Sequence, residues 1–131
     1  MKKLKKFSYP ITFLPCKDID DIRPFYEEIL QLKVALEQKR CILFKIRDSY
    51  WGFCDHYDEQ IEHPERVCLT LVVNTRGQVN NWHSRMIKNF VPCKKRPEYN
   101  SKFKIYNAFY TDPTGYTIEI QSFDEDGKPK F

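Results

Sequence analysis

Apolar residues in the first half of the chain switch between strand spacing and helix spacing. Residues 11–16, ITFLPC, form a short apolar run typical of a buried strand. Acidic residues from Asp18 to Asp21 then cap a helix that has Pro24 in its first turn. Apolar residues at helical spacing give this helix one apolar face through about Leu32. They are Ile22, Phe25 or Tyr26, Ile29 and Leu30. Residues 32–37, 41–46 and 49–56 predict three strands, and a polar turn at residues 47–49 joins the last two.

The second half of the chain repeats this order. Residues 66–73 predict a strand, and Thr75 to Gln78 match a capping box that begins a helix. The apolar stripe of this helix is Val79, Trp82, Met86, Ile87 and Phe90. Residues 91–95, 103–111 and 116–123 predict three more strands, and residues 97–102 predict a loop.

This repeat predicts an α+β fold in which two βαβββ modules form curved mixed sheets around a shared cleft. The modules span residues of about 8–57 and 65–124 of one domain, 1–131, which has a short basic N-terminal tail and a polar C-terminal tail.

Composition narrows the class of protein. The 131 residues are 41% apolar and 15% aromatic, as expected of a globular chain, and the net charge of +4 is too small to indicate nucleic-acid binding. No signal peptide or membrane-spanning run is found, so we expect a cytoplasmic protein without membrane contact. The five cysteines are odd in number and lack CxxC spacing, which predicts free thiols in a reducing compartment, without a disulfide framework or zinc knuckle.

The segment FYTDPTGYTIEIQSF, residues 109–123, carries the most specific pattern. Asp112-Pro113-Thr114-Gly115 predicts a tight turn between two strands. In the second strand Ile118 and Ile120 share one face, so Glu119 lies on the other, with Thr117 and Gln121. That carboxylate either meets water or lines a site.

The pattern D-P-x-G-(x3)-E from Asp112 to Glu119, with LPCKDIDDIRPFYEEIL and its Phe25-Tyr26 pair, resembles the vicinal oxygen chelate superfamily. That superfamily includes glyoxalase I, bleomycin-resistance proteins and extradiol dioxygenases. In its metal-dependent members, the resemblance implies, a divalent ion is held by residues of the first strand of each half and of the last strand. Glu119 matches the last position, but Ile11 and Arg66 (or Val67) match the others and are not metal ligands. We therefore expect no metal and no other cofactor.

Alternation along the strands predicts the wall of the cleft. Glu119 is the candidate catalytic residue, and the candidate ligand-binding residues are Phe13, Trp51, Phe53, Asp55, Arg66, Cys68, Asn107, Phe109 and Gln121. We further predict that Arg66 pairs with Glu119 across the cleft, in the place that a metal takes in relatives. The histidines share no ligand spacing, and only His56, near the cleft mouth, is kept as a ligand contact.

Three functions fit these features. The first is a protein that binds a small organic molecule without a catalytic metal, as the resemblance to bleomycin-resistance proteins implies. The second is a lyase, isomerase or dioxygenase that uses Glu119 as metal ligand or general base. The third is a dimeric regulatory or interaction module, since many relatives form homodimers.

Overall fold

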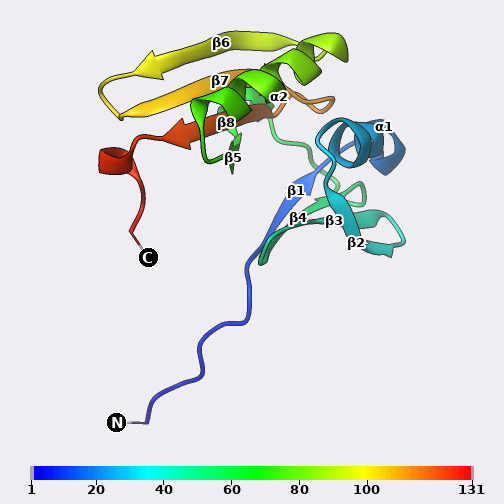
Figure 1. Ribbon diagram of the computed structural model, residues 1–131. Helices are drawn as coiled ribbons and strands as arrows, with labels where there is room; N and C mark the ends of the chain where they lie inside the picture. The colour runs from blue at the N-terminus through cyan, green and yellow to red at the C-terminus, as the bar shows by residue number, and fades with distance from the viewer. Residues whose placement is uncertain (1, 131) are drawn as a thin grey trace. The chain divides into compact units, whose positions relative to one another are not determined.

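The computed structural model describes residues 2–130, apart from the side chain of Asp126, and divides into two compact units between Ile61 and Glu62. The first unit contains β1 (Ile11–Pro15), α1 (Ile19–Pro24), the π-helical turn η1 (Phe25–Ile29), β2 (Lys33–Gln38), β3 (Cys41–Ile46) and β4 (Ser49–Cys54) (Figure 1). Its sheet has the order β1-β4-β3-β2, in which β1 runs parallel to β4 and the other pairs are antiparallel.

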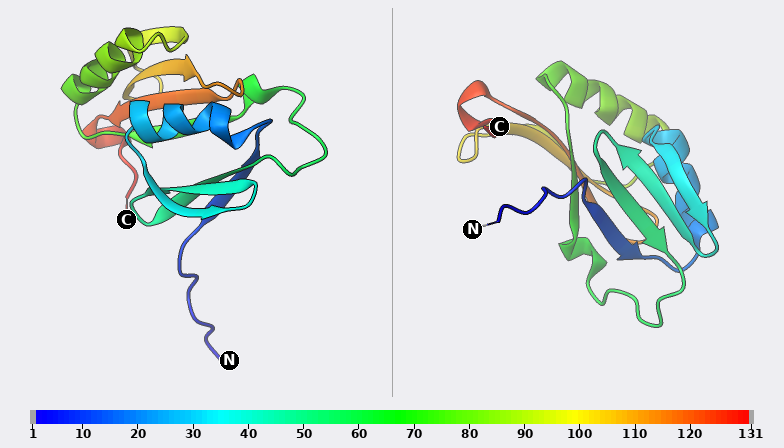
Figure 2. Two further views of the ribbon diagram at one scale, coloured as in Figure 1. Left: turned by 90° about the vertical axis from the view of Figure 1, so that its right-hand side faces the viewer. Right: turned by 90° about the horizontal axis from the view of Figure 1, so that it is seen from below.

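The second unit repeats this arrangement. It contains η2 (Pro64–Arg66), β5 (Cys68–Val72), α2 (Arg76–Lys88), β6 (Cys93–Asn100), β7 (Ile105–Thr111), β8 (Thr117–Phe123) and η3 (Glu125–Gly127). Its sheet has the order β5-β8-β7-β6, again with one parallel pair, β5 and β8. Each helix packs on one face of the sheet of its own unit (Figure 2). The predicted α+β fold of two four-stranded mixed sheets is confirmed.

The helices begin where the sequence predicts. The Asp18 carboxylate accepts a hydrogen bond from Asp20 N at 2.9 Å. Thr75 Oγ1 accepts from Gln78 N at 3.1 Å, and Gln78 Oε1 accepts from Thr75 N at 3.0 Å, which completes the capping box. These bonds satisfy amide groups that have no partner within the helix.

The prediction that Pro24 lies in the first turn of α1 is wrong, because Pro24 is the last of the six residues of this helix. Proline has no N–H to continue the α-helical ladder, and the chain goes on as a π-helix in which Leu30 N donates to Phe25 O at 2.9 Å. The turn places Tyr26, which is fully buried, over Phe44 and Phe53, with ring centroids 5.5 and 4.4 Å away. This aromatic cluster is the core of the first unit.

The core of the second unit lies between α2 and the sheet, where Ile118, Ile120, Val79 and Met86 are buried. The predicted helical stripe is only partly correct, because Ile87 and Phe90, at the C-terminal end of α2 and beyond it, are exposed. The predicted loop at residues 97–102 is also partly wrong, since β6 continues to Asn100. Proline is tolerated within β6 because this edge strand has register shifts on both sides of Lys95.

The prediction of five free thiols is wrong. Cys41 and Cys54 form a disulfide, and Cys16, Cys68 and Cys93 are not disulfide-bonded. Residues 47 and 48 form a two-residue turn between β3 and β4, which sets Cys41 directly opposite Cys54. Because two of the five cysteines form a disulfide, the odd number of cysteines no longer supports a reducing compartment.

Within residues 2–130 the structure contains no helix that is both long enough and apolar enough to span a bilayer.

Candidate functional site

Glu119 lies on the face of the second sheet that is turned away from α2. In β8 the side chains of Ile118 and Ile120 are fully buried on the helix side, and Glu119 and Gln121 point the other way. The cross-strand partners of Glu119 are Thr70 on β5 and Phe109 on β7, and those of Gln121 are Val72 and Asn107. The alternation in β8 predicted this face correctly.

Glu119 is 8% exposed and is held by two neutral donors. Thr70 Oγ1 donates to Glu119 Oε1 at 2.8 Å, and Asn107 Nδ2 donates to Glu119 Oε2 at 2.7 Å. Asn107 Oδ1 in turn accepts from Lys95 Nζ. An ammonium group only donates and a carboxylate only accepts, so these neighbours fix the orientation of the Asn107 amide. Lys95, Asn107, Glu119 and Thr70 therefore form a polar network whose hydrogen bonds are directed toward Glu119 from both sides, and we call it the Glu119 network.

The Glu119 network borders a pocket of about 530 Å³ that lies wholly within the second unit. Its lining combines polar and aromatic side chains, among them Lys95, Tyr99, Phe103, Asn107, Phe109 and Glu119. Lys95 Nζ lies 5.4 Å from the ring centroid of Phe109, so one ammonium group contacts both the ring and the amide. This volume and lining are typical of a site for a small organic molecule.

Cys68 and Gln121 complete this face of the sheet. The Cys68 thiol lies 3.8 Å from Glu119 Oε1, to which it donates a weak hydrogen bond. Burial and the nearby Glu119 charge raise the pKa of Cys68, although the Thr70 hydrogen bond opposes this, so the group is a thiol at neutral pH. In the part of the chain whose side chains are described, Gln121 Oε1 is the one buried side-chain oxygen or nitrogen without a hydrogen-bond partner.

Arg66 does not pair with Glu119. It is exposed and ends η2, before β5 begins, and no ion pair joins it to Glu119 in the described part of the chain. The strand alternation that led to Arg66 fails because the chain turns into a 3-10 helix there, with Arg66 N bonded to His63 O. Thr70 and Asn107 take the place that we predicted for the guanidinium.

In the first unit the predicted wall residues divide between the two faces of the sheet. Phe13 is half exposed on the face turned away from α1. Trp51 and Phe53 share a face, as predicted, but Tyr26 packs on both of them, with centroids 6.3 and 4.4 Å away, so this is the helix face. Both faces of β4 carry apolar residues, and alternation alone does not show which one the helix covers.

Asp55 is likewise a structural residue and not part of a pocket wall. Its carboxylate accepts from Ile19 N at 3.2 Å, at the start of α1, and from Arg40 Nε at 2.9 Å. Burial acts to raise the pKa of Asp55, but the bonds from Arg40 and Ile19 outweigh it and lower the pKa below its usual value. Asp55 thus fastens the helix to the end of the β3–β4 hairpin.

Comparison with known proteins was made at three levels. No protein-family model matches the chain, and no curated protein matches it. Several solved structures do match its fold. A glyoxalase/bleomycin resistance protein/dioxygenase from Nocardioides aligns with a TM-score of 0.77 at 12% identity, over 98% of this chain and 91% of that one. A lactoylglutathione lyase from Agrobacterium tumefaciens aligns at 0.72 and 17% identity, over 86% and 90%.

A family enzyme of the same description from Burkholderia phytofirmans aligns with a TM-score of 0.73 at 17% identity, over 89% of this chain and 98% of that one. The chain has the glyoxalase/bleomycin-resistance fold. Identities this low establish the fold alone, because the glyoxalase/bleomycin-resistance fold supports several unrelated chemistries.

The metal that this fold implies does not fit the residues that the resemblance assigns to it. Ile11 has no donor atom, Arg66 is a cation, and both Glu119 oxygens already accept hydrogen bonds. The Cys68 thiol also lies beside Glu119, and its raised pKa disfavours the thiolate that metals require. Among the side chains that the structure describes, Glu119 belongs to no group of three His, Cys, Asp or Glu that could hold an ion.

Sequence reasoning missed two features. Lys95 joins the Glu119 network through a register that includes a β-bulge, and no sequence signal for this register is evident. The group of Cys41, Cys54 and His56 was visible in principle. Cys41 and Cys54 are equally far from a two-residue turn, and His56 follows Cys54 by two positions, the spacing of one strand face.

Proposed function

We propose that this chain binds a small organic molecule, without a catalytic metal, in the pocket beside Glu119. The observation that carries this proposal is the buried carboxylate of Glu119, held in place by Asn107 and Thr70 at the border of a pocket of about 530 Å³. Burying a charged group is costly unless its bonding is complete, so a carboxylate kept at a pocket border favours a binding role over a purely structural one.

The lining indicates the chemistry of the ligand. Tyr99, Phe103 and Phe109 offer aromatic surface, so a planar or aromatic molecule would fit best. Glu119 Oε1 already accepts from Thr70 and Cys68, whereas Oε2 accepts from Asn107 and keeps a second lone pair, which would accept an N–H or O–H group of the ligand. Lys95 offers further donors for a carbonyl or an anionic group. The preferred ligand is therefore an aromatic molecule with both a hydrogen-bond donor and an acceptor.

The test is a screen of aromatic acids, amides and phenols by ligand-observed NMR against the wild-type chain and two variants. Glu119→Gln removes the charge and one acceptor from the pocket. Glu59→Gln makes the same chemical change at an exposed position of the first unit and is the control. We expect the best compounds to lose at least about tenfold in affinity, or about 1.4 kcal/mol, with Glu119→Gln. Equal affinities for both variants, or no binding compound at all, would contradict the proposal.

The homodimer expected from the resemblance stays a prediction, and sedimentation equilibrium of the purified chain tests it.

A further inference from the structure

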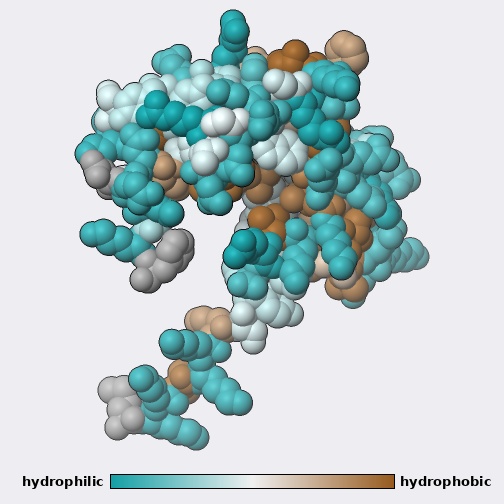
Figure 3. Space-filling model, in the orientation of Figure 1, coloured by the Kyte–Doolittle hydropathy of each residue, from teal (hydrophilic) through white to brown (hydrophobic). Residues whose placement is uncertain are grey.

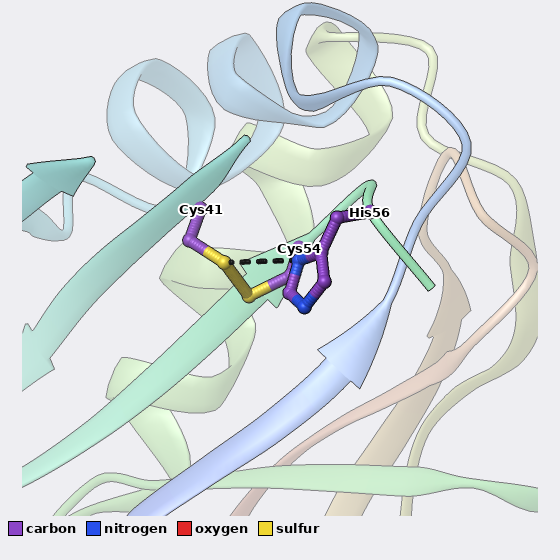
Figure 4. A group of neighbouring side chains, drawn as sticks. All are labelled: Cys41, Cys54 and His56. Atoms are coloured by element: carbon purple, nitrogen blue, oxygen red, sulfur yellow. Dashed lines mark hydrogen bonds between the residues drawn. A yellow bond between two sulfur atoms is a disulfide. The ribbon is translucent and has the colours of Figure 1, made fainter. Parts of the chain in front are cut away.

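Cys41, Cys54 and His56 form a second group of reactive side chains, within the first unit (Figure 4). Their ligand atoms, the two Sγ and a ring nitrogen of His56, all lie within 4.8 Å of one another. His56 Nδ1 lies 3.5 Å from Cys41 Sγ. Leaving out Asp126, whose side chain is not described, this is the one group of three or more His, Cys, Asp or Glu side chains in residues 2–130 that lie closely enough to hold a metal ion.

The backbone brings these three side chains together. Cys41 begins β3 and Cys54 ends β4, directly opposite each other in the antiparallel pair, with Cα atoms 4.2 Å apart. The pairing continues one step further, since Asp55 N donates to Arg40 O at 3.0 Å. His56 follows at once, and its ring stacks on Tyr57 with centroids 4.5 Å apart. The backbone of the β3–β4 hairpin therefore brings the three side chains together, and their proximity does not depend on long flexible side chains.

The group borders a pocket of about 370 Å³ within the first unit, on the sheet face turned away from α1. The other lining residues are mostly apolar and include Ile11, Phe13, Leu36, Leu43 and Tyr57. Several of these are exposed, and apolar surface is visible on the first unit in Figure 3. Cys54 is buried, Cys41 is partly exposed and His56 is exposed, so small solutes reach the group from one side.

We propose that Cys41, Cys54 and His56 are a redox-controlled site for a thiophilic divalent cation such as Zn²⁺. In the oxidised chain the two sulfurs are bonded to each other and bind no cation. In the reduced chain two thiolates and one imidazole nitrogen hold the cation. Nothing in this site depends on the ligand proposed for the Glu119 pocket.

The two steps balance. A dithiol reductant supplies two electrons and two protons, the bond between Cys41 Sγ and Cys54 Sγ breaks, and the reductant becomes a disulfide. The two thiols then release two protons when one Zn²⁺ binds their sulfurs, and neutral His56 adds a nitrogen without losing a proton from the binding atom. Oxidation of the thiolates reverses both steps and releases the cation.

The donor set favours zinc over harder cations. Thiolate and imidazole are the ligands that Zn²⁺ prefers, whereas Mg²⁺ and Ca²⁺ prefer oxygen. Three protein ligands leave the fourth tetrahedral position for water or a solute, the arrangement of zinc sites that are not closed. That position is free to face the neighbouring pocket, whose apolar walls would strengthen the interaction of the cation with a bound solute.

The first experiment counts thiols and titrates metal in a chain carrying Cys68→Ser and Cys93→Ser, which removes the two accessible free thiols. Anaerobic reduction with a phosphine and desalting should raise the number of titratable thiols by two. Co²⁺ is then added as a spectroscopic probe, followed by Zn²⁺. We expect one Co²⁺ per reduced chain, with a thiolate charge-transfer band and tetrahedral visible bands that Zn²⁺ abolishes. The same chain left oxidised is the matched control and should give neither band.

The His56→Ala variant tests the third ligand without disturbing the disulfide, because His56 is exposed. We expect its Zn²⁺ affinity to fall at least about tenfold, with an unchanged thiol count and circular dichroism spectrum. Three results would overturn the proposal: no gain of thiols on reduction, no metal binding by the reduced chain, or equal affinity in His56→Ala and its parent.

Discussion

Asn107→Asp tests the Glu119 network most directly. In the native chain Asn107 Nδ2 donates to Glu119 Oε2 at 2.7 Å, and both residues are buried, with 3% and 8% of their surface exposed. The variant replaces this donor by a carboxylate oxygen of nearly the same size. Lys95 keeps the oxygen that it now contacts, so the bond to Glu119 is the one that the change removes.

The size of the effect follows from two competing costs. Two negative charges about 2.7 Å apart repel by about 6 kcal/mol at an effective dielectric constant of about 20. Binding a proton at pH 7 to a carboxyl group with an ordinary pKa near 3.9 costs about 4 kcal/mol. Proton uptake costs less than the charge repulsion, so it sets the size of the penalty. A stronger hydrogen bond from Lys95 offsets about 1 kcal/mol of this penalty. We therefore expect a loss of about 3 kcal/mol in the free energy of unfolding at pH 7.

The same reasoning fixes the sign of the pH dependence. The folded variant binds one proton that its unfolded chain does not bind at neutral pH, so its stability relative to wild type falls as pH rises. At pH 5 proton uptake costs only about 1.5 kcal/mol, and we expect the penalty to fall below about 1 kcal/mol. Urea unfolding followed by circular dichroism at both pH values measures this difference.

Asn100→Asp is the matched control for this experiment. The Asn100 side-chain oxygen accepts from Lys102 N at 3.0 Å and from Phe103 N at 3.2 Å, and a carboxylate accepts both bonds equally well. We expect a change within about 0.5 kcal/mol. A penalty for Asn107→Asp that matches this control, or that stays constant between the two pH values, would refute the directed network.

Two further predictions concern stability. Gly115 has a φ of 109°, and a Cβ there would lie 3.0 Å from Pro64 Cγ, so Gly115→Ala should destabilise the chain by about 1–3 kcal/mol in urea unfolding. Gly77→Ala, in a helix where a Cβ would make an ordinary contact with Thr75 Oγ1 at 3.8 Å, should instead stabilise it by up to about 1 kcal/mol, and equal effects would contradict the strain argument. Asp55→Ala should cost about 1–2 kcal/mol at neutral pH, since it removes the acceptor at the start of α1, whereas exposed Asp58→Ala should not. Because the pKa of Asp55 is lowered on folding, this difference should vanish as pH falls through that pKa, and a constant difference would exclude the carboxylate as its source.

Local patterns in the sequence were sufficient for much of the fold and for the centre of the candidate site. The caps at Asp18 and Thr75 are made by side chains within three residues of the amides that they satisfy. The turn after Asp112 is equally local, since one Asp112 oxygen accepts from Thr114 N, Gly115 N and Tyr116 N. The prediction of the face on which Glu119 lies was also correct, because the pair Ile118 and Ile120 identifies the side of β8 that packs on the helix.

Tertiary structure decided what alternation leaves ambiguous. β4 is apolar on both faces, and only the packing of Tyr26 shows that Trp51 and Phe53 belong to the core. The hydrogen-bond partners of Glu119 lie on β5 and β7. Lys95, which donates to Asn107, lies on the edge strand β6, where the register is shifted. The two-residue alternation of a strand shows which of its side chains share a face. Which face a helix covers, and which side chain arrives from a neighbouring strand, depends on contacts between residues far apart in the chain.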